Sequence, residues 1–221
     1  MGNHGEKDLS GPRPKDFWAI GSKNTALLVI DMQLSFVDPK SPLYVPESIE
    51  LVPGINLLSA ACRKVKIPVI FIKNNCRADL SDTGLKVDML PIVPGSVDEE
   101  MTPREGKKGN ELFSGLVIEK DDYVVNKILY SALISGSSSL EPLLRGLGKD
   151  TLLVCGVCTD VCVGTTIMDG MMLGFKAILV TDLTKTFTEE RHNAALVVYD
   201  EHFAKLMKLD EVIHEINSLV V

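Results

Sequence analysis

Short apolar runs separated by polar segments recur along the whole chain, and they predict the strands of a buried sheet. The runs are rich in Val, Ile and Leu, as in TALLVID, PVIFIK, YVVNK, TLLVCG and FKAILVTD. Strands that are buried on both faces of a parallel sheet have this composition. We expect strands at Thr25–Asp31, Pro68–Lys73, Tyr123–Lys127, Thr151–Gly156, Phe175–Asp182 and His202–Met207.

Segments with helical periodicity lie between these runs. The longest, Glu47–Val65, places Ile55, Leu58 and Ala61 on one face, which suits packing against a sheet. Gly174 follows another such segment as a helix stop. Further helices are expected at Ser139–Leu147, Asp160–Leu173, Glu189–Asp200 and Asp210–Ser218. This alternation predicts a three-layer α/β/α fold with a mostly parallel sheet.

Two segments fall outside this alternation. Residues 1–24 are polar and interpreted as an N-terminal arm, in which Phe17 and Trp18 would dock on the remaining domain, residues 25–221, or on a second subunit. Residues 76–122 are rich in Pro, Gly and charge, and only NELFSGL suggests a short helix there. A long irregular stretch in a compact domain is often a functional cover, so we expect a lid.

Composition excludes several classes of protein. The 221 residues carry a formal net charge of -7 without a block of like charges, so nucleic-acid binding has no electrostatic basis. We find neither a stretch long enough to span a bilayer nor a hydrophobic signal core, which favours a cytoplasmic protein. An odd count of 5 cysteines argues against a disulfide framework. The cluster Cys155, Cys158 and Cys162 lacks the second pair of ligands that structural zinc usually needs.

Three of the predicted strands lead to a different reactive side chain: Asp31, Lys127 and Cys162. The carboxyl ends of parallel strands share one edge, where binding sites form. Cys162 is expected in the first turn of a helix, whose N-terminus would lower the pKa of its thiol. Each residue alone has a structural alternative: Asp31 could cap a turn, Lys127 could be solvated, and Cys162 could be buried core. Their convergence favours a cysteine nucleophile with its activators.

Three sequence blocks together resemble the isochorismatase-like cysteine hydrolases. They are TALLVIDMQLSFVDP, VVNKILYSAL and GVCTDVCVGTTIMDGMMLGFKAILVTD, and the resemblance runs from about Thr25 to Val212. It implies a flavodoxin-like fold, a catalytic triad of Cys162, Asp31 and Lys127, and a homodimer or homotetramer. It also implies an oxyanion hole from the backbone N–H groups of Cys158 and Cys162, with a cis peptide between Val157 and Cys158.

Differences between branches of that family narrow the activity. The nicotinamidase branch binds a metal through an Asp-Trp-His segment and a further His after the second strand, whereas FIKNNCRADLSD contains no His. We therefore expect neither metal nor cofactor. True isochorismatases lack the nucleophilic Cys. The sequence favours a cysteine amidohydrolase of the ureide and biuret branch, which cleaves a C–N bond of a small amide or ureide through a thioester. The alternatives are an isochorismatase-type hydrolase, a nicotinamidase-like amidase and a non-catalytic binding protein.

The substrate pocket is expected above the carboxyl ends of the strands, roofed by residues 76–122. Gln33 and Arg77 would donate hydrogen bonds to substrate carbonyl or carboxylate oxygens. Leu133 would be an apolar wall. The predicted lining is Gln33, Phe36, Arg77, Tyr130 and Leu133. Such donors would favour a ureide or carbamoyl compound over nicotinamide.

Overall fold

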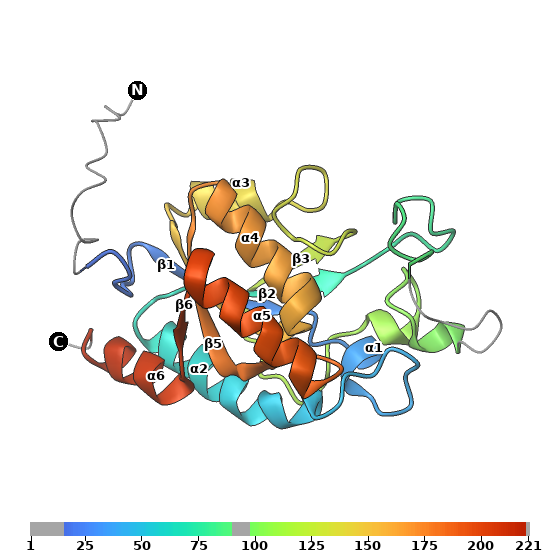
Figure 1. Cartoon of the computed structure of the whole chain (residues 1–221), viewed down its shortest axis with the longest axis horizontal. Coiled ribbons are helices and arrows are strands. Elements are labelled where there is room, and N and C mark those ends of the chain that lie inside the picture. Colours follow the sequence, from blue (N-terminus) through green and yellow to red (C-terminus); the bar gives the residue numbers. More distant parts are fainter. Residues whose placement is uncertain (1–15, 90–97, 220–221) are drawn as a thin grey trace.

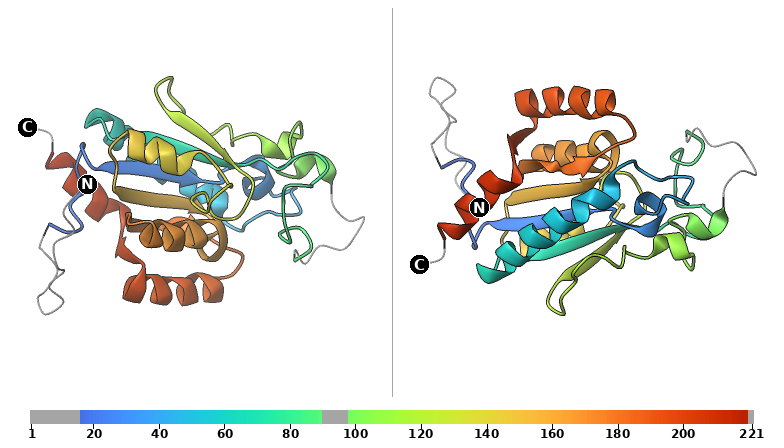
Figure 2. Two further views of the ribbon diagram at one scale, coloured as in Figure 1. Left: turned by 90° about the horizontal axis from the view of Figure 1, so that it is seen from above. Right: turned by 90° about the horizontal axis from the view of Figure 1, so that it is seen from below.

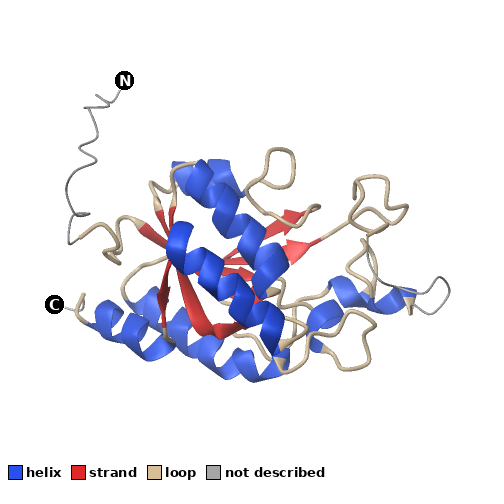
Figure 3. Ribbon diagram, viewed as in Figure 1, coloured by secondary structure: helices blue, strands red, loops and turns tan. Residues whose placement is uncertain are grey.

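A parallel sheet of 6 strands forms the centre of the molecule (Figures 1 and 3). The computed structural model describes residues 16–89 and 98–219. Every neighbouring pair of strands is parallel, in the order β3-β2-β1-β4-β5-β6. The strands are β1 Thr25–Ile30, β2 Val69–Asn74, β3 Tyr123–Lys127, β4 Thr151–Val157, β5 Lys176–Lys185 and β6 Ala204–Met207.

Helices cover both faces of the sheet (Figure 2). One face carries α2 (Val52–Lys64) and α6 (Leu209–Asn217), and the other carries α3 (Leu140–Gly146), α4 (Gly164–Met172) and α5 (Glu189–His202). Residues of β1 alternate between the two cores: Leu27 and Val29 pack on the α2 side, and Leu28 and Ile30 on the α4 side. Both faces are apolar, which explains the uninterrupted apolar run. The three-layer α/β/α prediction is confirmed.

The strand order determines where a site can form. Successive strands run outward from β1 to β3, then cross to β4 and run outward again to β6. Sites in such sheets lie outside the carboxyl ends of the strands, at the point where the direction reverses. Here that point lies between β1 and β4. This strand order is that of the doubly wound dinucleotide-binding sheet. The structure therefore shares its three layers with flavodoxin, but its strands follow a different order.

Two predicted helices differ in the structure. Glu47–Val65 begins as a 3-10 turn, Ser48–Leu51, and becomes α-helical in α2. The segment NELFSGL is not a helix. Leu112 pairs with Gln33 in an antiparallel bridge, and the Phe113 N–H donates to the Met32 carbonyl. These tertiary contacts use backbone groups that a helix would need. Short helical turns remain at α1 (Leu34–Val37), Glu99–Met101 and Lys108–Asn110.

The segments at the edges of the fold are only partly described. Trp18 packs against the core on the α2 side. The Phe17 ring packs edge-on against the Trp18 ring, with 4.9 Å between the ring centroids. Residues 1–15 of the predicted arm and 90–97 of the predicted lid lie outside the described residues. Among the helices that are described, none combines the length and hydrophobicity needed to cross a bilayer.

Candidate active site

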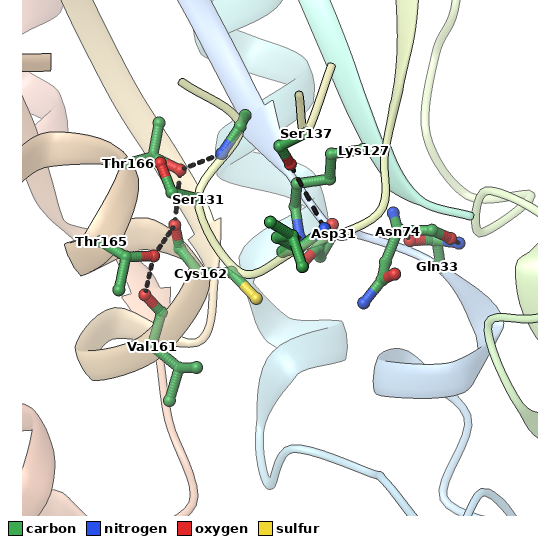
Figure 4. A network of polar contacts seen from close by, with 12 residues as sticks. Asp31, Gln33, Asn74, Lys127, Ser131, Ser137, Val161, Cys162, Thr165 and Thr166 are labelled. Carbon is green, nitrogen blue, oxygen red and sulfur yellow. Dashed lines mark hydrogen bonds and ion pairs between the residues drawn. The ribbon is translucent and has the colours of Figure 1, made fainter. Parts of the chain in front are cut away.

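Asp31, Lys127 and Cys162 lie together at the carboxyl edge of the sheet (Figure 4). Lys127 ends β3 and lies in register with Asn74 of β2, so its long side chain reaches past β2 to Asp31, directly after β1. The Lys127 Nζ is 2.8 Å from the Asp31 Oδ2. All three residues are buried, with 1%, 0% and 5% exposure for Asp31, Lys127 and Cys162.

The Asp31 carboxylate has spare hydrogen-bonding capacity. Apart from the ion pair with Lys127 and the contact with the Cys162 thiol, its oxygens have no hydrogen-bond partner in the described part of the chain. Asp31 adopts a left-handed backbone conformation with φ 55°, and its N–H donates to the Ile72 carbonyl of β2. Asp tolerates this conformation better than most residues, and such positions cluster at functional sites. The carboxylate can therefore accept a proton from Cys162.

Cys162 lies in a π-helical turn, Thr159–Val163, between β4 and α4. Sequence alone predicted an ordinary first α-helical turn. The Thr165 hydroxyl donates to the Val161 carbonyl and the Thr166 hydroxyl to the Cys162 carbonyl, each at 2.7 Å. The Thr166 hydroxyl also accepts from the Ala132 N–H at 3.0 Å, which ties the loop after β3 to this turn. The peptide bond between Val157 and Cys158 is cis, as the resemblance implied.

The electrostatics of Cys162 differ from the sequence prediction. Burial raises the pKa of the Cys162 thiol to about 12, although the Lys127 ammonium lowers it; Asp31 raises it further. The predicted low-pKa thiol is therefore wrong, because the cost of burying a thiolate exceeds the attraction of nearby positive charge. Burial also lowers the pKa of Lys127, but attraction to Asp31 and Cys162 raises it above its ordinary value. The resting site holds a neutral thiol beside a charged pair.

Gln33 does not face a substrate. It is fully buried, and its Nε2 donates to the Asn74 and Asn110 carbonyls, both at 2.9 Å. Its Oε1 accepts from the Asn74 N–H at 2.7 Å. Because both amide donors are used, the prediction that Gln33 donates to substrate is wrong. Gln33 instead holds the segment around Asn110 against the end of β2.

The other predicted lining residues divide into two groups. Arg77 is 62% exposed and pairs with Asp79 at 3.2 Å, and Leu133 is buried in the core against α4. Neither is among the residues that line the pocket described next, and both remain predictions. Phe36 of α1 is half-buried and packs on the core of the α2 face. Tyr130 does line the pocket.

A pocket of about 450 Å³ is lined by residues that follow Lys127 and Cys162 closely in the sequence. Leu129 and Tyr130, which follow Lys127 closely, form part of its wall, and Ile134 is the apolar wall that Leu133 was expected to be. Burial raises the pKa of Tyr130, and the nearby Cys162 and Cys158 thiols raise it further. The full lining is Thr83, Gly84, Leu85, Lys86, Met89, Leu129, Tyr130, Ser131, Ile134, Thr165, Met168 and Asp169.

Lys86 is the functional candidate that sequence reasoning missed. Its Nζ donates to the Asn74 Oδ1 at 3.1 Å, the Cys76 Sγ at 3.0 Å and the Ile128 carbonyl at 2.6 Å. It lies in an irregular segment without periodicity, so no pattern pointed to it. In the described residues, no cluster of three or more His, Cys, Asp or Glu side chains is arranged to hold a metal ion.

Comparison with known families identifies the chain. The isochorismatase domain matches residues 25–211, which include all three residues of the triad. The chain belongs to the isochorismatase family. Nicotinamidase 3 of Arabidopsis thaliana is a relative at 31% identity over 196 residues, covering 86% of this chain and 88% of the relative.

Two bacterial isochorismatase-family relatives are also similar. Ureidoacrylate amidohydrolase RutB of Pseudomonas syringae pv. syringae is 29% identical over 209 residues, covering 85% of this chain and 81% of that protein. The crystal structure of a cysteine hydrolase from Pseudomonas syringae pv. phaseolicola superposes with a TM-score of 0.82 at 30% identity, covering 91% of this chain and 96% of that one. The predictions of the family and of a hydrolase are therefore confirmed.

Proposed function

We propose that this isochorismatase-family protein is a cysteine amidohydrolase that cleaves a C–N bond of a small amide or ureide without a metal. The observation that carries the proposal is the buried Asp31–Lys127 ion pair beside Cys162, with carboxylate oxygens that have no other partner. A nucleophile next to a base, with the base held by a third group, is the arrangement that covalent acyl transfer requires.

The raised pKa of Cys162 assigns the first step to Asp31. The Cys162 sulfur attacks the substrate carbonyl carbon while its proton passes to the Asp31 carboxylate, and a C–S bond forms. The oxyanion accepts from the backbone N–H groups of Cys158 and Cys162, as the family resemblance implies. Asp31 then protonates the leaving nitrogen, the C–N bond breaks and a thioester remains.

Water completes the cycle in the same site. Asp31 removes a proton from water, which attacks the thioester carbonyl. The C–S bond breaks, the acid leaves and the sulfur recovers the proton from Asp31. Lys127 keeps its charge throughout although it is fully buried, because Asp31 and Cys162 raise its pKa above the ordinary value. Its ammonium thereby stays paired with the Asp31 carboxylate that accepts the proton.

The end of β2 supports a site without metal. This is the segment where the nicotinamidase branch was expected to hold a metal ion. Here the Lys86 ammonium donates hydrogen bonds to the Asn74 Oδ1 and the Cys76 Sγ. A second cation at these atoms would be repelled by that charge. Activity should therefore survive dialysis against a chelator, and loss of activity that added zinc or iron restores would contradict this part of the proposal.

Nicotinamidase activity is the rival, favoured by the Arabidopsis relative at 31% identity. Ammonia release should be compared across nicotinamide, simple amides, ureides and carbamoyl amino acids. We expect a higher kcat/KM for a ureide or carbamoyl compound than for nicotinamide. A preference for nicotinamide would establish the rival. If the folded protein releases ammonia from none of these compounds, the alternatives that remain are an isochorismatase-type hydrolase and a binding protein.

A further inference from the structure

The Lys86 ammonium is a cation without a carboxylate partner at the wall of the pocket. Its three hydrogen-bond acceptors are an amide oxygen, a thiol sulfur and a backbone carbonyl, all neutral. No carboxylate of the described residues lies within ion-pair distance of it. A partly buried charge is costly unless it is paired, so this position favours an incoming anion.

Lys86 and the loop after β3 hold each other at two points. The Lys86 Nζ donates to the Ile128 carbonyl, and the Tyr130 hydroxyl donates to the Lys86 carbonyl at 3.3 Å. We call this pair of contacts the Lys86 clasp. Ile128 directly follows the proposed catalytic Lys127, Tyr130 lies three residues after it, and both Lys86 and Tyr130 line the pocket. The clasp therefore joins the pocket wall to the segment that carries Lys127.

The ammonium also acts on the nucleophile itself. Lys86 lowers the pKa of the Cys162 thiol, against the larger effect of burial. Thr165 lines the same pocket and its hydroxyl lies 3.5 Å from the Cys162 carbonyl. The pocket lining therefore includes both Lys86 and the helical turn that follows Cys162.

We propose that Lys86 determines substrate specificity by binding a carboxylate of the substrate, so that the enzyme selects small amides or ureides carrying a second, anionic end. The Cys76 thiol is a weak acceptor, and a carboxylate would replace it on the ammonium with a stronger, charge-assisted hydrogen bond. This inference rests on the proposed function, since it takes Cys162 as the attacking group. Asp169 of α4 also lines the pocket, so the site carries charges of both signs.

The test uses substrate pairs that differ only in charge. Succinamate carries a carboxylate where succinamide carries a neutral amide, and N-carbamoylglycine can be compared with its amide in the same way. Lys86→Met should lower kcat/KM for the anionic member about ten- to a hundredfold more than for the neutral member, mainly through KM. Lys86→Arg should restore most of the loss. Lys120→Met, an exposed lysine before β3, removes the same charge elsewhere and should change neither.

A binding measurement separates this inference from the proposed chemistry. Calorimetry on Cys162→Ala, with and without Lys86→Met, measures succinamate and succinamide binding without turnover. Tighter succinamate binding that disappears with Lys86→Met supports the inference even if the wild-type protein releases no ammonia. The inference would be overturned if Lys86→Met weakened the binding of both compounds equally, or if the protein with Lys86 bound succinamide more tightly. Either result would show that the clasp is only structural.

Discussion

At the scale of single residues, the site combines a charged pair and a neutral thiol in a dry setting. Lys127 is fully buried and Asp31 nearly so, and neither could remain charged there alone. Each keeps the other ionised. Burial raises the pKa of the Cys162 thiol to about 12, which favours the thiol over a preformed thiolate at neutral pH. The chemistry that we propose therefore depends on proton transfer to Asp31.

Asp31→Asn tests this dependence. The change keeps the side-chain volume but removes the base and the partner of Lys127, so kcat/KM should fall by at least about a thousandfold. An uncompensated buried ammonium should also cost about 3–5 kcal/mol in the free energy of unfolding. Steady-state assays and urea titration measure the two effects. Glu100→Gln, which breaks the exposed pair with Lys107, should change neither; near-normal activity of Asp31→Asn would contradict the role of Asp31.

The sequence could predict that the three residues meet, because Asp31 and Lys127 lie at the ends of apolar runs, Cys162 follows a third run within one helical turn, and parallel strands bring such ends together. It could not predict the partners of Gln33, Arg77 and Leu133. Gln33 was expected to face a ligand, yet its amide bonds to backbone groups from distant segments. Lys86 was missed because long-range contacts, and no local periodicity, place it beside the site.

At the scale of elements, the spacing between β1 and β4 positions the base relative to the nucleophile. Gly156 of β4 pairs with Ile30 of β1, one residue before Asp31. It has φ +107°, and a Cβ there would lie 2.1 Å from the Ile30 carbonyl oxygen. The sequence showed a glycine in an apolar run. Only the structure reveals that the glycine allows two backbones to approach next to the site.

Gly156→Ala should therefore damage both stability and catalysis. The backbones must separate, and the left-handed conformation is strained for alanine, so we expect a loss of more than about 2 kcal/mol in the free energy of unfolding. Activity should fall further than stability alone explains, because Asp31 moves. The control is Gly146→Ala at the end of α3, where a Cβ meets nothing within 4 Å. Equal stability and activity in the two variants would contradict this account.

At the scale of the whole molecule, buried thiols make the fold sensitive to alkali. Burial raises the pKa of Cys62 and of Cys162 to about 12, and raises those of Cys155 and Cys158 as well. In the unfolded chain these thiols ionise near their ordinary value of 9.0. Above that pH the unfolded state binds fewer protons than the folded state, so the stabilisation is complete below pH 9 and is lost as pH rises toward 12.

The free energy of unfolding should therefore decline between pH 9 and pH 10. Each buried thiol contributes a limiting slope of about 1.4 kcal/mol per pH unit. Urea titrations at pH 7, 8, 9 and 10 measure the decline. Cys62→Ala, in α2 and away from the triad, removes one contribution and should reduce the slope while leaving turnover unchanged. If the free energy of unfolding does not change from pH 8 to pH 10, the folded state does not raise the pKa of these thiols.

The layers and most strand positions of the molecule could be predicted from apolar patterning, since the runs buried on both faces are long and clear. The NELFSGL segment could not, because Leu112 and Phe113 pair with residues near Gln33 that lie far away in sequence. The pocket could not be predicted for the same reason. It forms between residues around Lys86, the loop after β3 and α4, whose association depends on the complete fold.

The central claim, that Cys162 carries the acyl group, is tested most directly by acid-quench mass spectrometry during turnover. With a ureide or amide substrate that the enzyme hydrolyses slowly, a peptide containing Cys162 should gain the mass of the acyl group. The gain should disappear when substrate is exhausted and be absent in Cys162→Ala, which should also lose activity. An acyl group on another residue, or continued turnover by Cys162→Ala, would contradict the account.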